Sequence, residues 1–146
     1  MGSVYEGSVA GRFGNRKPPA SAYAGESPVL SQNMTTLSWA GGMFWDGRAT
    51  GWTLGDPLAE QAKGPFLNPM EQGLPDAACL VYRVVNSDYK HLYKQVWSEV
   101  NIKWPKNTCS DVVALPQDDQ NKVNEAYNNI ARSIAAYERS KEVSSF

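Results

Sequence analysis

The sequence has few of the residues that metal and redox sites usually require. Its 146 residues include two cysteines, Cys79 and Cys109, and a single histidine, His91. No Cys-x-x-Cys pair is present, and the ligands are too few for an ordinary Cys/His zinc site, so we expect no metal centre. The two cysteines are compatible with a disulfide in an oxidising compartment or with two inert buried thiols, and both alternatives stay open.

Long apolar runs and an excess of one charge are also missing. No stretch approaches the roughly 20 apolar residues of a membrane span, and the first residues contain no hydrophobic block of the signal-peptide type. The formal net charge of −1 offers nothing to nucleic acid or to an anionic membrane. We therefore expect no nucleic-acid partner and no membrane span, and any export signal would lie outside this chain.

Glycine and proline are distributed unevenly along a chain of ordinary globular composition. All 12 glycines and seven of the nine prolines lie at or before Pro75. Both residue types interrupt regular structure, so residues 1–75 are expected to be rich in loops and residues 76–146 to be helical. The length of 146 residues fits one domain, and we predict a single domain over 1–146.

The second half contains three helix signals. Asp76 can cap a helix through "AACLVYRVVN", and Ser87 can cap a longer one, because apolar residues from Tyr89 to Val100 recur at helical spacing. His91 is expected on the wet surface of that helix. After Pro116 a final helix is predicted, with acidic residues in its first turn and an apolar stripe that ends near Tyr137.

The stretch "GGMFWDGRATGWTLGDPLAEQAKGPFLNPMEQ" is the most unusual part of the sequence. Asp46 and Arg48 flank a glycine and are expected to close a turn with an ion pair. A glycine-rich half must bury apolar area through a few large side chains, so its three tryptophans are expected in the core. These tryptophans are Trp39, Trp45 and Trp52.

The same stretch places two polar side chains on stiff elements. Asp56 can start a short helix that ends at Gly64 and carries Gln61 near its end. The following "GPFLNPMEQG" is expected to be a loop constrained by its prolines, which holds Glu71 on rigid backbone. A carboxylate and an amide so placed could converge on one small polar ligand, with Glu71 as a proton shuttle.

Three blocks of the sequence, in this order, resemble the bacterial diheme cytochrome c peroxidases and their relative that makes the tryptophan tryptophylquinone cofactor. "GNRKPPASAYA" is similar to the Arg-x-x-Pro segment after the first haem of that family. "MFWDGRA" followed by "LAEQAKGPFLNPMEQ" resembles its most characteristic signature, with a few extra residues from Thr50 to Asp56. "NIARSIAAYERSKEVSSF" resembles the helix that closes the first half of the family proteins.

The resemblance implies an all-α, cytochrome c-like fold and reduction of hydrogen peroxide in the periplasm by a protein with two c-type haems. It places Trp45, with Phe44 beside it, on the electron path between the haems, and it places Gln61 and Glu71 in the peroxide pocket. It also implies that Phe44, Trp45 and Pro65 contact a haem. Glu71 would carry a proton between the two peroxide oxygens.

The chain departs from this family in one essential feature, because it has no Cys-x-x-Cys-His motif for covalent haem attachment. The haem c is therefore expected on the remainder of a longer protein or on a companion chain, and a small electron-donor protein is the expected redox partner. Lys17 stands where the family has an asparagine that helps to hold calcium, so calcium binding is doubtful.

Two other interpretations of the sequence stay open. The chain could be a haem-free scaffold of the same fold that docks an electron-transfer partner, and exposure of Trp45 in an apolar patch would favour this alternative. Noncovalent haem binding is the second, although His91 is the sole imidazole that could serve as an axial ligand.

Overall fold

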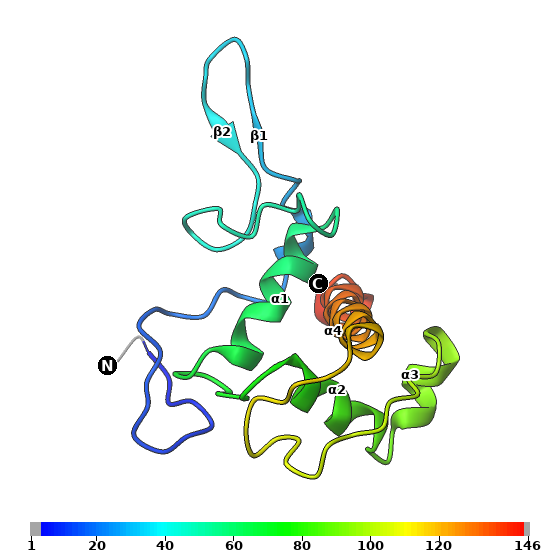
Figure 1. Cartoon of the computed structure of the whole chain (residues 1–146). Helices are drawn as coiled ribbons and strands as arrows, with labels where there is room; N and C mark the ends of the chain where they lie inside the picture. The colour runs from blue at the N-terminus through cyan, green and yellow to red at the C-terminus, as the bar shows by residue number, and fades with distance from the viewer. Residues whose placement is uncertain (1–3, 145–146) are drawn as a thin grey trace. The chain divides into compact units, whose positions relative to one another are not determined.

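Eight elements of secondary structure follow one another along residues 4–144, the part of the chain that the computed structural model describes (Figure 1). They are the 3-10 helix η1 (Ala24–Glu26), the strands β1 (Ser31–Gln32) and β2 (Trp39–Ala40), and the helices α1 (Pro57–Leu67), α2 (Ala77–Val85), α3 (Lys90–Val96), α4 (Gln117–Glu138) and α5 (Lys141–Ser144). Within these residues, no helix is both long enough and apolar enough to cross a membrane.

The chain divides into two compact units. The first comprises the residues up to Asn15 together with Pro65–Asn129, and the second comprises Arg16–Gly64 together with the residues from Ile130 onward. The prediction of a single domain over 1–146 stays a prediction.

The fold is mainly helical, but the all-α prediction misses a small antiparallel ribbon. Strand β1 pairs with β2, with Ser31 opposite Ala40 and Gln32 opposite Trp39 (Figure 1). The turn between them is built by Asn33, whose Oδ1 accepts hydrogen bonds of 2.9 and 3.1 Å from the backbone N–H groups of the two threonines that follow. Two-residue strands leave no alternating pattern in a sequence, so this ribbon could not be predicted from periodicity.

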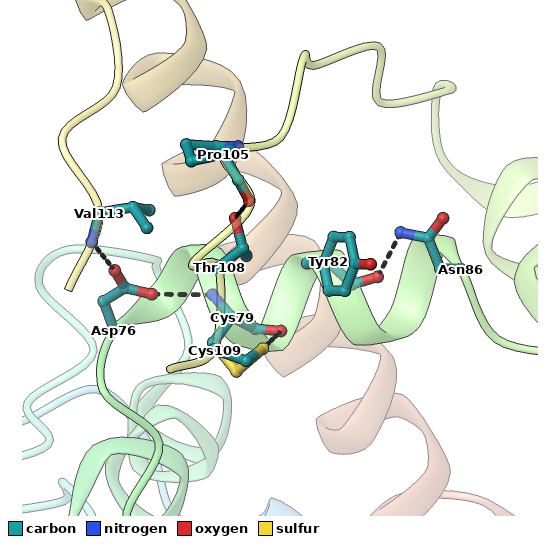
Figure 2. The surroundings of a disulfide bond; sticks show 8 residues. All are labelled: Asp76, Cys79, Tyr82, Asn86, Pro105, Thr108, Cys109 and Val113. Carbon is teal, nitrogen blue, oxygen red and sulfur yellow. Dashed lines mark hydrogen bonds between the residues drawn. A yellow bond between two sulfur atoms is a disulfide. The ribbon is translucent and has the colours of Figure 1, made fainter. Parts of the chain in front are cut away.

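Helix α2 in the first unit begins at the cap that the sequence predicts. Asp76 Oδ1 accepts a 2.8 Å hydrogen bond from the backbone N–H of Cys79, and its other oxygen accepts one of 2.8 Å from Val113 (Figure 2). One carboxylate therefore caps the helix and also binds the segment around Val113, which is far away in the sequence. The helix buries Ala78, Cys79, Leu80 and Val81, four consecutive residues that together span a full turn.

The connection between α3 and α4 is fastened to α2 by a disulfide. Cys79 and Cys109 are joined, which settles the alternative that the sequence leaves open (Figure 2). The rings of Tyr82 and Trp104 meet edge to face, with centroids 5.5 Å apart. The Thr108 hydroxyl donates a 2.7 Å hydrogen bond to the backbone oxygen of Pro105. A segment without regular structure is thus held at several points.

Helix α3 is shorter than the apolar spacing predicts. It ends at Val96 instead of near Val100, because Trp97 takes an extended conformation. The predicted Ser87 cap is also wrong, since the Ser87 hydroxyl donates to the carbonyl of Val84 in the preceding helix. Val100 lies past the helix and is half-buried, so it contributes apolar area to the connection that follows α3 and not to the helix. His91 lies exposed on the helix, as predicted.

Helix α1 starts at its predicted cap but passes the predicted end. Asp56 Oδ1 accepts a 3.0 Å hydrogen bond from the backbone N–H of Leu58. The helix then continues through Pro65 to Leu67, so the loop predicted after Gly64 begins three residues later. Proline removes one N–H donor, yet its ring fixes φ near the helical value, and a final turn can therefore continue past it.

The loop before α1 is organised by one carboxylate of that helix. Glu60 accepts hydrogen bonds of 2.7, 2.7 and 2.9 Å from the backbone N–H groups of Gly51, Thr53 and Leu54. Burial by itself would raise the pKa of Glu60, but these three bonds and a contact with Thr50 outweigh it and lower the pKa. Residues 51–54 are thus held by hydrogen bonds to a single side chain.

Helix α4 matches the predicted final helix. It begins after Pro116, and Val123, Tyr127 and Ile130 are buried along the predicted stripe, whereas Tyr137 at its end is 60% exposed. Near that end, Arg139 donates two hydrogen bonds of 2.7 Å to the carboxylate of Asp56. The core of the second unit consists of Met43, Ala49, Leu58, Ala59 and Ala135, with Ala24, Phe44 and Leu54 packed against it.

Candidate functional site

Residues 43–49 form a tight loop that carries the predicted electron-transfer residues. Its ends are paired by two backbone hydrogen bonds between Met43 and Ala49, of 2.8 and 3.3 Å. Inside it, the N–H of Gly47 donates a 3.1 Å bond to the carbonyl of Phe44. Phe44 itself has φ of +60°, a left-handed conformation that is uncommon for a bulky residue. Such strain often accompanies functional loops.

Trp45 projects from this loop into solvent with 79% of its surface exposed. Trp52 and Trp39 are also exposed, at 64% and 56%, so the prediction that the three tryptophans form a core is wrong. The core of this unit is filled by alanine, leucine and methionine side chains instead. Trp52 donates through Nε1 to the carbonyl of Leu30 at 2.8 Å and its ring tilts against Trp39.

The loop carries the charged side chains of Asp46 and Arg48, and Arg16 lies against it. Arg48 makes two hydrogen bonds of 2.8 and 2.9 Å to the Asp46 carboxylate, which confirms the predicted ion pair across the turn. Arg16 lies 3.5 Å from the same carboxylate. Burial alone would raise the pKa of Asp46, but hydrogen bonds and charge attraction from Arg48, with a smaller contribution from Arg16, hold it below the ordinary value of 3.8. Asp46 is therefore ionised at neutral pH.

The two arginines also cover the two aromatic rings of the loop. The Arg48 guanidinium carbon is 3.7 Å from the ring centroid of Phe44, and that of Arg16 is 4.9 Å from the ring centroid of Trp45. Phe44 packs against α1 as well, because a Cβ added at Gly64 would lie 3.3 Å from its ring. Glycine at position 64 thus allows the close approach of the ring to the helix.

Gln61 lies on α1 in the second unit and is half-buried. Pro65 follows it by four residues, so the helical hydrogen bond that an N–H at this position would give to the Gln61 carbonyl cannot form. The local backbone around this predicted peroxide-pocket residue therefore differs from that of a regular helix. Pro65 is the first α1 residue that belongs to the other unit.

Glu71 lies in the first unit and is held through its backbone and one carboxylate oxygen. Its backbone N–H donates a 2.9 Å bond to the Asn68 carbonyl, and its own carbonyl accepts a 2.7 Å bond from the N–H of Ser8. The Asn68 side chain donates a 2.7 Å bond to Glu71 Oε1. A side chain at Gly7 would collide with the backbone oxygens of Met70 and Glu71. The backbone of Glu71 is thus held by hydrogen bonds at both its N–H and its carbonyl.

The predicted site residues are divided between the two units. Phe44, Trp45 and Gln61 lie in the second unit, where Phe44 and Trp45 share one loop, and Pro65 and Glu71 lie in the first. The convergence of Gln61 and Glu71 on one ligand stays a prediction.

Two residues with a direct role in this geometry were missed from the sequence. Asn68 holds the carboxylate of Glu71, and its position before a proline signalled only a turn. Arg16 covers Trp45 from 29 positions earlier in the chain, and no local pattern connects the two.

The residues of this chain do not fit covalent haem attachment. A c-type haem requires thiols near a histidine ligand, and both cysteines are joined in a disulfide. His91 is exposed on α3 with its Nδ1 3.2 Å from the carbonyl oxygen of Asp88. Within residues 4–144, no three His, Cys, Asp or Glu side chains gather in a way that could hold a metal ion. A haem would therefore need attachment elsewhere.

Comparison with known proteins places the chain in a defined context. The chain is 28% identical over 145 residues to the methylamine utilization protein MauG of Paracoccus denitrificans. The aligned region covers 99% of this chain and 31% of that protein. It shares its fold with the diheme peroxidase BthA of Burkholderia thailandensis, with a TM-score of 0.71, 23% identity, and coverage of 98% of this chain and 29% of that one.

A BthA variant, Y463M, gives a TM-score of 0.69 at 24% identity. The chain thus spans about a third of the length of these relatives. The family model for di-haem cytochrome c peroxidase matches residues 2–146. With that match over nearly its whole length, the chain belongs to the di-haem cytochrome c peroxidase family.

Proposed function

We propose that this chain is part of a di-haem peroxidase-like oxidoreductase that reduces hydrogen peroxide. In this proposal the chain supplies residues of the peroxide pocket and of the path between the haems, and the c-type haems are attached to the remainder of a longer protein or to a companion chain. Family membership and the fixed carboxylate of Glu71 support the proposal. A periplasmic location is part of it, and the disulfide suits an oxidising compartment.

The chemistry assigned to this chain is proton transfer and positioning. Reduction of one hydrogen peroxide to two waters consumes two electrons and two protons, and the electrons come from a small donor protein. The haem supplies, when bound, the iron at which the oxygen–oxygen bond is cleaved. Glu71 takes a proton from one peroxide oxygen and gives it to the other, which then leaves as water. Gln61 orients the peroxide by hydrogen bonding.

The observation that carries the proposal is the preorganisation of Glu71. Asn68 occupies Oε1, and backbone hydrogen bonds fix both the N–H and the carbonyl of Glu71. The carboxylate therefore needs little reordering when a ligand arrives, which lowers the entropic cost of binding and proton transfer.

The test begins with protein purified from its source with associated chains retained. A pyridine haemochrome assay and intact mass measurement should show haem on a partner chain or on a longer polypeptide. In that assembly, Glu71→Gln should reduce peroxide turnover by about a hundredfold or more, as expected for loss of a general acid–base. Glu142→Gln on the exposed surface of α5 is the matched control. Turnover by Glu71→Gln equal to that of the control would contradict the proposal.

A haem-free scaffold that docks an electron-transfer protein is the second candidate function. The exposure of Trp45, at 79% of its surface, favours it, because exposed aromatic side chains are enriched at binding sites. Colourless protein with the mass of the bare chain, which binds a small redox protein and loses that binding on Trp45→Ala, would support this candidate over the enzyme.

A further inference from the structure

Arg16 holds a positive charge over one face of Trp45. Its guanidinium carbon is 4.9 Å from the centroid of the indole ring, within the range of a cation–π interaction. Asp46 anchors this arrangement, because its carboxylate lies 3.5 Å from Arg16. The same carboxylate is held on its other side by the two short hydrogen bonds from Arg48. The cation over the ring is thus part of a connected cluster within the second unit.

Oxidation of Trp45 removes one electron from this ring. The radical cation that forms is repelled by the guanidinium that attracted the neutral ring, so the presence of Arg16 disfavours the loss of an electron. In this chain by itself the indole is exposed, so its N–H proton can leave to water after oxidation. Trp52 is also exposed, but its contacts are with the ring of Trp39 and the carbonyl of Leu30. Trp45 therefore has a guanidinium over its ring, whereas these contacts of Trp52 are with uncharged groups.

We propose that Arg16 is a positioning residue that raises the reduction potential of the Trp45 radical. This inference rests on the proposed electron-transfer role of Trp45. A raised potential restricts Trp45 to electron exchange with strongly oxidising centres, of the kind that peroxide generates in a peroxidase. Weaker one-electron oxidants in the surroundings then leave the residue intact.

The experiment oxidises the whole chain with tris(bipyridine)ruthenium(III), which light generates from the ruthenium(II) complex in the presence of a cobalt(III) complex that takes up the electron. Each ruthenium(III) ion takes one electron from an indole and becomes ruthenium(II), the indole proton passes to water, and a nitrone spin trap forms a bond to the neutral radical. Peptide mass spectrometry gives the tagging of Trp45 relative to Trp52 in the same sample. Arg16→Met keeps much of the covering bulk without the charge, whereas Arg16→Lys keeps the charge.

Arg16→Met should increase the tagging ratio about two- to fivefold, the factor that corresponds to an exposed cation–π contact. Arg16→Lys should stay close to the unchanged protein, and so should Lys17→Met, which removes the neighbouring charge. A ratio for Arg16→Met equal to that of the unchanged protein overturns the inference, as does a ratio for Arg16→Lys equal to that of Arg16→Met. The electron-transfer role of Trp45 is tested by a different measurement. Unaltered peroxide turnover of the Trp45→Phe variant in the haem-loaded assembly would contradict that role, and it would leave the tagging ratios of the Arg16 variants unaffected.

Discussion

At the scale of single residues, the contact on which the proposed function depends most is that between Asn68 and Glu71. The amide donates to Glu71 Oε1 at 2.7 Å, and its own oxygen accepts a 3.0 Å bond from the N–H of Met70. Asn68 therefore fixes the direction of the carboxylate and the shape of the turn that carries it. A carboxylate that moves proton between two oxygens depends on such placement.

Replacement of Asn68 tests this dependence. In the haem-loaded assembly, Asn68→Ala should lower kcat for peroxide by about tenfold, because Glu71 loses its orienting donor. Asn124→Ala, on the exposed side of α4, should leave kcat unchanged. Steady-state turnover with both variants measures the effect. Equal kcat for the two variants would show that the carboxylate is positioned by its backbone alone.

Two glycines with left-handed backbone provide a matched pair of stability measurements. Gly41 has φ of +93° and an added Cβ would lie 2.5 Å from the carbonyl oxygen of Pro28, whereas Gly55 has φ of +72° with open space around it. Gly55→Ala should cost about 1 kcal/mol of left-handed strain, and Gly41→Ala should cost clearly more. Urea unfolding followed by circular dichroism gives both values. A cost for Gly41→Ala no larger than that for Gly55→Ala would disprove the crowding.

Residue-level prediction from the sequence succeeded where partners are close along the chain. Asp46 and Arg48 are two positions apart, and the Asp76 cap reaches three positions to Cys79, so local spacing identified both. The exposure of Trp45 was not predictable in this way. Burial of a large side chain depends on what the rest of the chain packs around it, and here alanine, leucine and methionine side chains fill the core of the second unit.

At the scale of elements, the disulfide fastens the irregular connection between α3 and α4 to helix α2. It joins residues that are 30 positions apart in the sequence. Cross-linking a loop of this length restricts the unfolded chain and is worth about 3–4 kcal/mol in the chain-entropy description. The contact between Tyr82 and Trp104 lies within the same closed loop.

Removal of this disulfide should lower the free energy of unfolding by about 2–4 kcal/mol. The double substitution Cys79→Ala with Cys109→Ala, unfolded in urea, measures the loss. Added dithiothreitol should destabilise the unchanged protein and have no effect on the double variant. A double variant as stable as the oxidised protein would mean that contacts such as that of Asp76 with Val113 suffice to hold the connection.

Prediction of elements was accurate where an apolar stripe coincided with a helix start signal, the Asp76 cap in α2 and Pro116 before α4. It failed where tertiary structure decided the outcome. Helix α3 ends at Val96 because its next residues turn into the connection, and α1 passes Pro65 because proline is compatible with helical φ. The β1–β2 ribbon is specified by the Asn33 turn, which a search for strand periodicity does not detect.

At the scale of the whole molecule, one ion pair joins parts of the chain that are 83 positions apart. Arg139, just after α4, donates two hydrogen bonds to Asp56 at the start of α1. These hydrogen bonds are the main reason that the pKa of Asp56 lies below 3.8 in spite of partial burial, and the same contact raises the pKa of Arg139. Gly25 packs so closely on the Arg139 side chain that a Cβ there would clash.

The lowered pKa values of Asp56 and Glu60 predict sensitivity to acid. A carboxylate with a lower pKa in the folded state stabilises the fold above its unfolded pKa, and that contribution is lost as pH falls through the folded pKa. The unfolded values are 3.8 and 4.5, so the urea midpoint should be level at neutral pH and fall below about pH 4.5. Asp56→Asn should cost about 1 kcal/mol at pH 7, because the pair is partly exposed.

The acid-dependent part of that cost is measured by comparing unfolding at pH 7 and pH 3. The free energy of unfolding should fall less between pH 7 and pH 3 in Asp56→Asn than in the unchanged protein. Asp88→Asn, on an exposed turn, should have the same free energy of unfolding as the unchanged protein at both pH values. Parallel curves for Asp56→Asn and the unchanged protein would show that the Arg139 contact does not contribute to acid unfolding.

The family could be identified from the sequence at this largest scale, because three blocks in fixed order resemble it and the family model matches residues 2–146. The division into two units could not, since each unit combines segments from distant parts of the chain. The relation of Gln61 to Glu71 depends on that division. The sequence blocks identify the family, whereas the geometry that brings Gln61 and Glu71 to one site stays a prediction.

Glu60 makes the loop before α1 unusually tolerant of sequence change. Three of its contacts there are with backbone N–H groups, so they do not depend on which side chains Thr53 and Leu54 carry. Thr50 and Gly51 are exceptions, since Thr50 contacts Glu60 through its side chain and a Cβ added at Gly51 would lie 2.7 Å from the ring of Pro57. The surface around Trp52 can therefore diversify between homologues, or accept an engineered label at position 53, while the conformation of the loop is retained.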